Sequence, residues 1–321
     1  MILKMKLRNL SLYFLCLTFC FASCKKDDDD FVSVPLRDRG EQQIADKDSI
    51  IKYLDSHYYN ASDFDGTNPN VTSKDLVITE YVKGTDIPDG HKLLSDDYVT
   101  KMVTFAATDY EIFYIDLNVG TNEDSPSPNF PDNVLVNYEG TTLDNEIFDS
   151  TATPVEFDLL SLIPGWRKVL PEFRTSEGFN ENEDGTVDYI NPGVGIMFVP
   201  SGLAYFATGS GIISPYESII FKFDLYQMSE NDHDNDNVPS FLEDWNTNDG
   251  EFTLNTTGAE VRDGDDTDSN GIPDYFDADD DGDGIPTINE DIDKDGDPTN
   301  DIGKNGIPKY LDPEETESNG L

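Results

Sequence analysis

Apolar residues recur at helical spacing between residues 40 and 60, near the start of the chain. This spacing predicts an amphipathic helix, because residues three or four apart share one face. Asp46 and Asp48 are the candidate N-caps. The predicted buried face consists of Ile44, Ile51, Leu54 and Tyr58.

Apolar and polar residues alternate over residues 110–120, which predicts a strand, and further extended segments up to residue 228 make the region strand-rich. Leu159–Leu170 carries the one convincing helical pattern inside it. Many strands and one short helix predict an α+β fold, with an antiparallel sheet wrapped around the helix. Residues 71–82 and 98–105 are further candidate strands, although no motif marks residues 61–109. The strands predicted inside the region are residues 110–120, 133–139, 154–158, 194–200 and 219–228.

Acidic residues outnumber basic ones so strongly that the net charge of the chain is -45. A nucleic-acid-binding protein needs positive charge to displace counterions from phosphate, so this class is excluded. The acidity is concentrated at the end of the chain, where residues 230–321 hold 29 acidic and 4 basic residues. Apolar residues are too sparse there for an ordinary core, so this segment needs its own explanation.

The first 24 residues have the layout of an export signal. Lys4, Lys6 and Arg8 precede an apolar run, Leu10–Phe21, that is too short to span a bilayer. The run ends in Phe21-Ala22-Ser23-Cys24, which resembles a bacterial lipobox whose cysteine becomes acylated. The alternative is an ordinary signal peptide that ends near a cysteine.

Cysteine usage favours the lipoprotein interpretation. Cys16 and Cys20 would be removed with the signal, so Cys24 would be left alone and disulfides could not hold the exported protein together. Several acyl chains on one cysteine would give a firm anchor. The following Lys25-Lys26-Asp27-Asp28-Asp29-Asp30 resembles the acidic sorting signals of Bacteroidetes surface lipoproteins, and a plain solvated tether explains it equally well.

Five short segments in the strand-rich region follow one another in an informative order. They are Val134–Gly140, Phe148–Ser150, Leu162–Trp166, Leu203–Tyr205, and Gly211–Pro215 leading into residues 219–225. In this order and at these separations they resemble an FKBP-type peptidyl-prolyl cis-trans isomerase domain. Many members of that family carry an N-terminal helical segment, so a helper role for residues 40–60 is an alternative to a purely structural one.

Such an enzyme needs an aromatic box more than it needs acids, bases or metals. The X-Pro bond rotates over a barrier of about 20 kcal/mol, and its twisted transition state has less charge separation than the planar amide. An apolar cavity favours the twisted form because it withholds the water that stabilises the ground state. The three histidines, His57, His91 and His233, lie outside this region, and no catalytic cofactor is expected.

The resemblance assigns a role to each position of the box. Trp166 would floor the proline ring, and Leu162 and Ile163 would line the entrance, with the Ile163 backbone N–H donating to a substrate carbonyl. Tyr205 would supply a hydroxyl donor, and Asp149 is the acidic residue beside the pocket. The walls would be Tyr138, Phe148, Phe157, Trp166, Tyr205, Ile213 and Phe221. Taken singly, these aromatic residues are as well explained as core.

Four departures from the family pattern bear on activity. Phe206 stands where the family favours Gly, and Ser214 replaces the first of two prolines. Lys168-Val169 replaces Glu-Gly, and an acidic insertion covers residues 178–192. None of them removes a wall, so an active enzyme is the favoured interpretation and a fold kept for binding is the alternative.

The acidic residues of the tail are regularly spaced. Calcium loops alternate oxygen ligands, then have a turn residue, a backbone carbonyl and a closing carboxylate. Four segments fit this pattern, and the fourth is weaker because Gly303 occupies a ligand position. The predicted ligands are Asp232, Asp234, Asp236 and Glu243; Asp266, Asp268, Asn270 and Asp277; Asp279, Asp281, Asp283 and Glu290; and, in the weaker copy, Asp301, Asn305 and Asp312.

A proline follows the backbone-carbonyl position in every copy, at Pro239, Pro273, Pro286 and Pro308. The tail thereby resembles the calcium-dependent thrombospondin type 3-like repeats of bacterial surface proteins. Structural Ca²⁺ would let such a segment fold without a core. A disordered acidic stalk with chance spacing is the alternative.

Five segments follow from these patterns: a lipoprotein signal (residues 1–24), an acidic tether (25–40), a helical and mixed region (41–109), an isomerase domain (110–228) and a calcium-repeat region (229–321). The favoured function is a lipid-anchored isomerase of the cell envelope, at the outer membrane on its periplasmic or surface side, acting on proline-containing polypeptides. The alternatives are a calcium-dependent binding or adhesion lipoprotein and a structural surface lipoprotein. The oligomeric state is not determined by the sequence.

Overall fold

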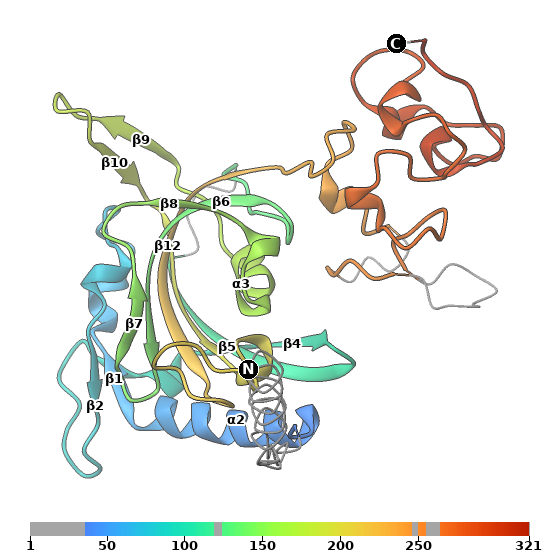
Figure 1. Ribbon diagram of the computed structural model, residues 1–321. Coiled ribbons are helices and arrows are strands. Elements are labelled where there is room, and N and C mark those ends of the chain that lie inside the picture. The colour runs from blue at the N-terminus through green and yellow to red at the C-terminus, as the bar shows by residue number, and fades with distance from the viewer. Residues whose placement is uncertain (1–35, 119–123, 246–249, 255–263, 321) are drawn as a thin grey trace, which may run out of the picture. The chain divides into compact units, whose positions relative to one another are not determined.

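A computed structural model of the protein describes residues 36–118, 124–245, 250–254 and 264–320 (Figure 1). The predicted signal, Cys24 and the acidic run after it lie outside these described residues, so their assignments stay predictions. Among the described helices, none combines the length and the apolar character that crossing a membrane would require.

The described residues contain a seven-stranded antiparallel sheet with the order β4-β5-β11-β12-β6-β7, in which β8 also pairs with β6. Its long strands are rich in β-branched and aromatic residues, which favour extended backbone. The bounds are β4 Val99–Phe105, β5 Thr108–Asn118, β6 Asn133–Thr142, β7 Ile147–Ser150, β8 Val155–Asp158, β11 Gly193–Val199 and β12 Ile219–Ser229. The predicted α+β architecture with an antiparallel sheet is confirmed.

Each face of the sheet buries a separate apolar cluster. Along β12, Phe221 and Phe223 belong to the cluster that includes α3 (Pro164–Val169), whereas Ile220 belongs to the cluster that includes α2 (Arg39–Asp55). This alternation follows from the two-residue repeat of a strand. Figure 1 shows α3 inside the curve of the sheet and α2 along its other side.

The predicted helix over Leu159–Leu170 is broken into three short pieces. A 3₁₀ turn, Leu159–Ser161, precedes α3, and a second, Leu170–Glu172, follows it. The break falls at Ile163, whose backbone is extended (ψ 148°) because the residue before a proline is disfavoured in helical conformation. Pro164 itself begins α3, where its missing N–H costs nothing.

The predicted helix near the N-terminus is present as α2. Of its predicted face, Leu54 is buried and Ile51 packs against the core, but the other two positions and the caps were wrong. Ile44 is 65% exposed, and Tyr58 lies beyond the helix in β1 (His57–Tyr59). The N-cap is Asp38, which accepts from the Glu41 N–H, while Asp46 is buried inside the helix. The periodicity misled because half of the buried face is polar: Gln42, Gln43, Asp46, Ile50, Tyr53 and Leu54.

Residues 57–97 form an irregular segment around a small sheet of order β2-β1-β3. The strand predicted over residues 71–82 is reduced to β2 (Ile78–Glu80), and β3 is Lys92–Leu93. Ser73 fastens this segment to the main sheet, because its N–H and hydroxyl both donate to Asp224 of β12, at 2.6 and 2.9 Å. The candidate strand over residues 98–105 is β4, which extends the main sheet.

The acidic insertion forms a hairpin of β9 (Gly178–Glu181) and β10 (Val187–Ile190). Tyr189 stacks on Tyr226 of β12 with ring centroids 4.3 Å apart. In its described part, the tail after β12 consists of turns and short 3₁₀ helices around one small apolar cluster of Val238, Tyr310 and Leu311. Pro239, Pro273, Pro286 and Pro308 each occupy the N-cap of such a turn.

Candidate functional site

The aromatic residues predicted to form a box lie together inside the curve of the sheet. The Trp166 ring on α3 lies 4.9 Å from the Phe221 ring and 5.7 Å from the Tyr138 ring, measured between centroids. Phe157 lies 5.8 Å from Tyr138, and Phe148 lies 5.5 Å from Phe221. Trp166 and Phe221 are each 3% exposed, whereas the other three rings are partly exposed. The box therefore has a buried floor and an accessible rim.

Gly140 of β6 makes this close approach of rings possible. A Cβ atom at this position would lie 2.6 Å from the Phe148 ring and 2.8 Å from the Phe221 ring, which is too close for any side chain. Tyr138 and Gly140 are two residues apart on one strand and face the same side. The Tyr-Glu-Gly segment thus places the Tyr138 ring in the box and leaves space beside it, because Gly140 has no side chain.

The remaining predicted wall and entrance residues also pack against this cluster. Ile213 is buried in it, and Leu162, Ile163 and Tyr205 are half-buried at its edge. Ile213 is held by a tight turn in which it exchanges two backbone hydrogen bonds with Ser210, at 2.8 and 2.9 Å. The structure therefore brings together all of the predicted box residues.

Asp149 forms the polar edge of the box. The Tyr138 hydroxyl donates to one oxygen of its carboxylate at 2.6 Å, and the backbone N–H of Ser150 donates to the other at 2.9 Å. Burial raises the pKa of Tyr138, and the hydrogen bond to the nearby carboxylate raises this pKa further. Burial, followed by the charge of Asp149, also raises the pKa of Tyr205. Both hydroxyls are therefore protonated donors at neutral pH.

Phe206, the first departure from the family pattern, keeps the backbone geometry that favours glycine. Its φ is 40°, a region that is strained for a residue with a side chain. Its ring packs 5.1 Å from the Tyr216 ring and 4.2 Å from the Arg39 guanidinium, so aromatic and cation–π contacts offset the strain.

The other departures are also accommodated locally. Ser214 donates its backbone N–H to the Glu217 carboxylate at 2.6 Å, a bond that a proline could not make. Lys168 is buried and forms an ion pair with Glu251 at 3.0 Å, while Val169 is core. These two changes at Lys168 and Val169 leave the neighbouring Trp166 in the box.

Helix α2 holds the loop that carries Tyr205, a role that the sequence did not reveal. The buried Asp46 carboxylate accepts from both the N–H and the hydroxyl of Ser201, at 2.8 and 2.7 Å. Arg39 donates to the Gly202 carbonyl at 3.1 Å. Burial raises the pKa of Asp46, although the bonds from Ser201 and Gln42 oppose this shift. The sequence did contain a signal for this role: polar residues three and four positions apart share one helix face with Ile50 and Leu54.

The predicted calcium loops bring carboxylates together in two of the four copies. In the third copy, Asp279, Asp281 and Asp283 cluster, and each uses one oxygen to accept a backbone N–H of its own loop. The second oxygen of each is buried and accepts no hydrogen bond within the described structure. Both oxygens of Glu290, the predicted closing ligand, are likewise buried without a donor. This donor set fits a hard cation.

In the first copy, Asp234, Asp236 and Glu243 cluster as predicted, and Asp280 joins them. Asp232 instead caps its own loop, accepting from the N–H groups of Asn235 and Asn237. Burial, and then the surrounding carboxylates, raise the pKa of Glu243 to about 10; the same causes raise the pKa of Glu290 to about 9. Acids buried side by side raise one another's pKa in this way, and at Glu290 the charge of Lys309 partly opposes the shift.

In the second calcium-loop copy, an amide lies between the predicted carboxylate ligands. The Asn270 amide donates to Asp268 at 3.0 Å and to Asp277 at 2.6 Å, so three predicted ligands lie side by side. Asp266 accepts the Gly271 N–H at 3.1 Å, the same turn bond that Asp279 makes with Gly284. Thus the predicted residues come together, with an amide between the carboxylates.

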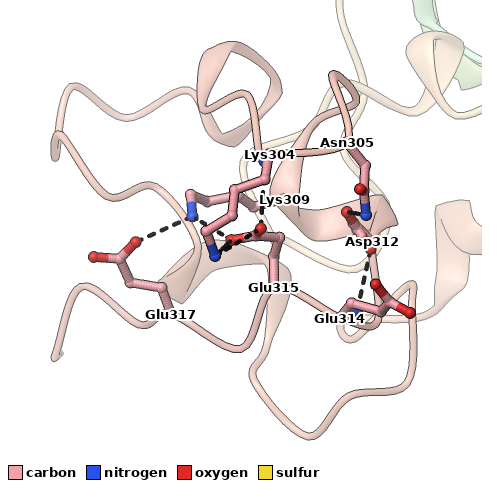
Figure 2. A network of polar contacts seen from close by, with 7 residues as sticks. All are labelled: Lys304, Asn305, Lys309, Asp312, Glu314, Glu315 and Glu317. Carbon is pink, nitrogen blue, oxygen red and sulfur yellow. Dashed lines mark hydrogen bonds and ion pairs between the residues drawn. The ribbon is translucent and has the colours of Figure 1, made fainter.

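The fourth copy is an ion-pair network (Figure 2). Lys304 and Lys309 both bind Glu315, at 3.1 and 3.2 Å, and Lys309 also binds Glu317 at 3.1 Å. Asn305 donates to Asp312 at 2.7 Å, as Asn270 does to Asp277. Lysine ammonium groups therefore neutralise Glu315 and Glu317, whereas the predicted ligand Asp312 accepts from an amide.

A further acidic cluster, Asp291, Asp293 and Asp295, was missed by the sequence analysis. The signal was present, because these residues alternate before Gly296 and are followed by Asp297-Pro298. Gly296 has φ 93° and donates to Asp291 at 2.9 Å, which repeats the turn of the other copies. Asp280 was also missed, since it falls between two predicted ligand positions.

The part of the chain that holds the box is similar to known proteins. Residues 125–226 match the model of FKBP-type peptidyl-prolyl cis-trans isomerases. The chain is 33% identical over 109 residues to the peptidyl-prolyl cis-trans isomerase Mip of Coxiella burnetii, covering 32% of this chain and 40% of that protein. It is 31% identical over 107 residues to the outer membrane protein MIP of Legionella longbeachae, covering 32% and 39%. A crystal structure of a Pseudomonas syringae peptidyl-prolyl isomerase matches at a TM-score of 0.31, with 27% identity, covering 41% of this chain and 81% of that one.

The tail matches a different family. Residues 233–300 match a model described as BamM C-terminal, not one of thrombospondin repeats. The chain spans about two fifths of the length of these two curated relatives. The family model extends from before β6 to residue 226 in β12 and includes every residue of the aromatic box, so this part of the chain is similar to FKBP-type peptidyl-prolyl cis-trans isomerases.

Proposed function

We propose that the protein catalyses cis-trans isomerisation of X-Pro bonds in exported or envelope proteins. The observation that carries this proposal is the box itself, in which the buried Trp166 and Phe221 rings lie beneath the half-exposed Tyr138 ring. A prolyl side chain that enters the box loses water around the amide. This loss raises the energy of the polar planar amide more than that of the twisted one, so the rotation barrier falls.

Each polar group at the rim has a distinct part in this mechanism. The Ile163 N–H donates to a substrate carbonyl at the entrance, and the Tyr205 hydroxyl donates from the loop above. Asp149 and Tyr138 act as a hydrogen-bonded pair that orients polar groups beside the twisting bond. No step makes or breaks a covalent bond, and the reaction takes no cofactor.

The proposal includes a lipid anchor at Cys24 and a position at the outer membrane, on its periplasmic or surface side. Its support is the lipobox-like Phe21-Ala22-Ser23-Cys24 and the name of a relative, which is an outer membrane protein. It also includes structural Ca²⁺ in the tail, supported by the two carboxylate clusters around Glu243 and Asp281. The tail would then be a cation-stiffened extension of thrombospondin type 3-like character.

A protease-coupled assay on a short X-Pro peptide tests the activity. The full chain should isomerise the peptide well above the uncatalysed rate, and Asp149→Ala should lower kcat/KM by about tenfold, the size expected from losing one hydrogen-bonded orienting group. Asp149 is exposed, so its removal should leave the fold intact. Asp144→Ala, at an exposed acid in the turn of the same hairpin, is the matched control.

A folded protein with no rate above background would reject the isomerase. The alternative function, a calcium-dependent binding or adhesion lipoprotein that uses the same fold, predicts that outcome together with saturable peptide binding. Equal loss of rate in the Asp149 and Asp144 variants would instead reject the assigned role of Asp149 while leaving the activity standing.

A further inference from the structure

Asp280 lies between two ligand positions of the third calcium loop but faces a different group of carboxylates. Its neighbours Asp279 and Asp281 cluster with Asp283, whereas Asp280 clusters with Asp234, Asp236 and Glu243 of the first loop. In the second group, one oxygen from each residue lies within 4.8 Å of the others. One stretch of backbone thus presents acids to two separate clusters.

The second cluster is buried. Asp236, Glu243 and Asp280 are each 1% exposed. Both oxygens of Glu243 and both oxygens of Asp280 are shielded from solvent and accept no hydrogen bond within the described part of the chain. Buried polar groups are satisfied in nearly all native proteins, so two fully unsatisfied carboxylates point to a ligand that binds them.

No side chain of the described residues supplies that ligand. None of the ion pairs formed there involves Asp234, Asp236, Glu243 or Asp280. The contrast with the fourth loop is direct, because there Lys304 and Lys309 bind Glu315. Several carboxylates buried together are strongly destabilising unless positive charge lies among them.

The chemistry of the four residues selects calcium among the common cations. Oxygens bound to one calcium ion at 2.3–2.6 Å lie at most about 5 Å apart, which agrees with the observed clustering. Calcium takes six to eight oxygens and accepts many carboxylates, whereas magnesium keeps several waters and is usually held by one or two carboxylates. Zinc prefers nitrogen and sulfur ligands.

We propose that Asp280 completes a calcium site with Asp234, Asp236 and Glu243, and that this ion fastens the first loop to the third. The inference deepens the calcium-binding part of the proposed function, which assigned each ion to a single loop, and it is independent of isomerase activity. The small apolar cluster of Val238, Tyr310 and Leu311 adjoins the site through Val238, which donates its N–H to Asp236. One ion would therefore join Asp280 to residues that precede it by 37 to 46 positions in the sequence.

Calorimetric calcium titration of the full chain, freed of metal by chelation, tests the site. Compared with the wild type, Asp280→Asn should weaken one class of sites by about tenfold or more, because calcium affinity follows the number of charged ligands. Asp281→Asn is the matched variant, one residue away in the other cluster, and it should weaken a different class. The double variant should lose both classes.

Two outcomes would overturn the proposal. One is an Asp280→Asn titration that matches the wild type in ion number and affinity; the other is a loss that duplicates the Asp281→Asn loss, so that the double variant loses no more. If calcium binds with Asp280→Asn unaffected, the shared site fails while calcium binding to single loops stands. If the wild type binds no calcium, both the shared site and calcium binding by single loops are rejected. The isomerase activity is tested separately by the peptide assay.

Stability measurements distinguish a lost site from a misfolded variant. At low calcium, Asp280→Asn should not lower the melting temperature of the tail, because the proposed site is then mostly empty in the wild type as well. With saturating calcium it should lower that temperature relative to the wild type. A variant that lowers it in both conditions by the same amount is merely damaged, and that result contradicts the site.

Discussion

Carboxylates are buried both in the sheet domain (α2, residues 57–97 and the main sheet) and in the acidic tail, but they are satisfied in opposite ways. In the domain, Asp46 accepts two hydrogen bonds from Ser201, and Asp224 accepts two from Ser73. In the tail, Glu243 and Asp280 accept none within the described structure. The first pair is satisfied by donors of the protein itself, whereas the proposed calcium ion would satisfy the second. Burial of an acid is therefore no guide to its function until its donors are counted.

The two regions also differ in what holds them together. The domain packs aromatic and aliphatic side chains on both faces of its sheet, and Phe223, Val194 and Ile196 are fully buried there. In the described part of the tail, the apolar cluster has only three buried members, Val238, Tyr310 and Leu311. Hydrophobic burial can stabilise the domain, but it is too small to do so for the tail. The comparison predicts that the two regions respond independently to metals and to core mutations.

Calcium removal should give the largest difference between the regions. Chelation should abolish the protease resistance of residues 264–320, because the Glu243 and Asp281 clusters then repel without a cation. The isomerase rate of the same sample should not change, since the box contains no carboxylate cluster. Limited proteolysis with mass spectrometry, read beside the peptide assay, measures both.

Two controls sharpen this experiment. Calcium should restore resistance and magnesium should not, because magnesium gives up its waters reluctantly. A tail that resists proteolysis equally with and without chelator would show that the ion-pair network of Lys304, Lys309 and Glu315 suffices by itself. That result would remove the proposed contrast.

A core mutation in the domain should have the next largest effect. Trp166→Ala should destabilise the domain by about 3–5 kcal/mol, the usual cost of truncating a buried tryptophan, and should abolish isomerase activity because the floor of the box is lost. The calcium titration of the tail should be unchanged. Denaturant unfolding followed at both regions checks the two parts, and a coupled loss of calcium binding would contradict their independence.

How much of this arrangement could be predicted depended on the kind of signal. The box could be predicted because its residues lie in short segments of fixed order, such as Ile163-Pro164-Gly165-Trp166. Such segments can be recognised in the sequence without knowing which distant residues they contact. The predicted strands also match β6, β11 and β12 to within three residues at their ends. The Leu159–Leu170 helix was overextended because the effect of Pro164 on Ile163 was not considered.

The features that were missed depend on contacts between distant residues. Asp46 looked like a surface cap, because nothing local indicates that Ser201 would bury it. Asp280 lies out of step with its own loop, and only the folded chain brings it to Glu243. The Asp291, Asp293 and Asp295 cluster is different, since its spacing was visible in the sequence and was overlooked.

The third prediction concerns the contact between α2 and the loop that carries Tyr205. Asp46→Ala should destabilise the domain by about 3 kcal/mol, because it leaves the buried N–H and hydroxyl of Ser201 without an acceptor. Ser201 is close to Tyr205, so kcat/KM should fall as well, while calcium binding stays constant. Asp48→Ala, at an exposed acid on the same helix, is the control. Equal behaviour of the two variants would exclude a positioning role for α2.

The fourth prediction concerns pH. Burial raises the pKa of Asp224 to about 6, although the bonds from Ser73 oppose the shift. A carboxyl whose pKa is higher in the folded state stabilises the fold most below its unfolded pKa, near 4, and this contribution is lost as the pH rises through about 6. The domain should therefore lose on the order of 2 kcal/mol between about pH 4 and about pH 7 through this group.

Asp224→Asn should remove that part of the pH dependence. Its amide can still accept from the Ser73 N–H through one oxygen, so the anchor of residues 57–97 should persist. The measurement is the difference in unfolding free energy between variant and wild type across this pH range, with calcium saturating so that the tail contributes equally to both. A difference that does not vary with pH would show that Asp224 keeps its charge throughout.

The smallest expected effect separates rings that serve the box from rings that only pack. Tyr189 of the acidic hairpin stacks on Tyr226, and the residues alternating with Tyr226 on β12, Phe223 and Leu225, belong to the cluster around Trp166. Tyr189→Leu should cost about 1 kcal/mol, the usual worth of an aromatic pair beyond its buried area, and should leave kcat/KM unchanged. Tyr189→Phe keeps the ring and should be neutral. If Tyr189→Leu slowed isomerisation without affecting stability, the hairpin would have to contact the substrate. The insertion would then be a substrate-binding element instead of a structural addition to the fold.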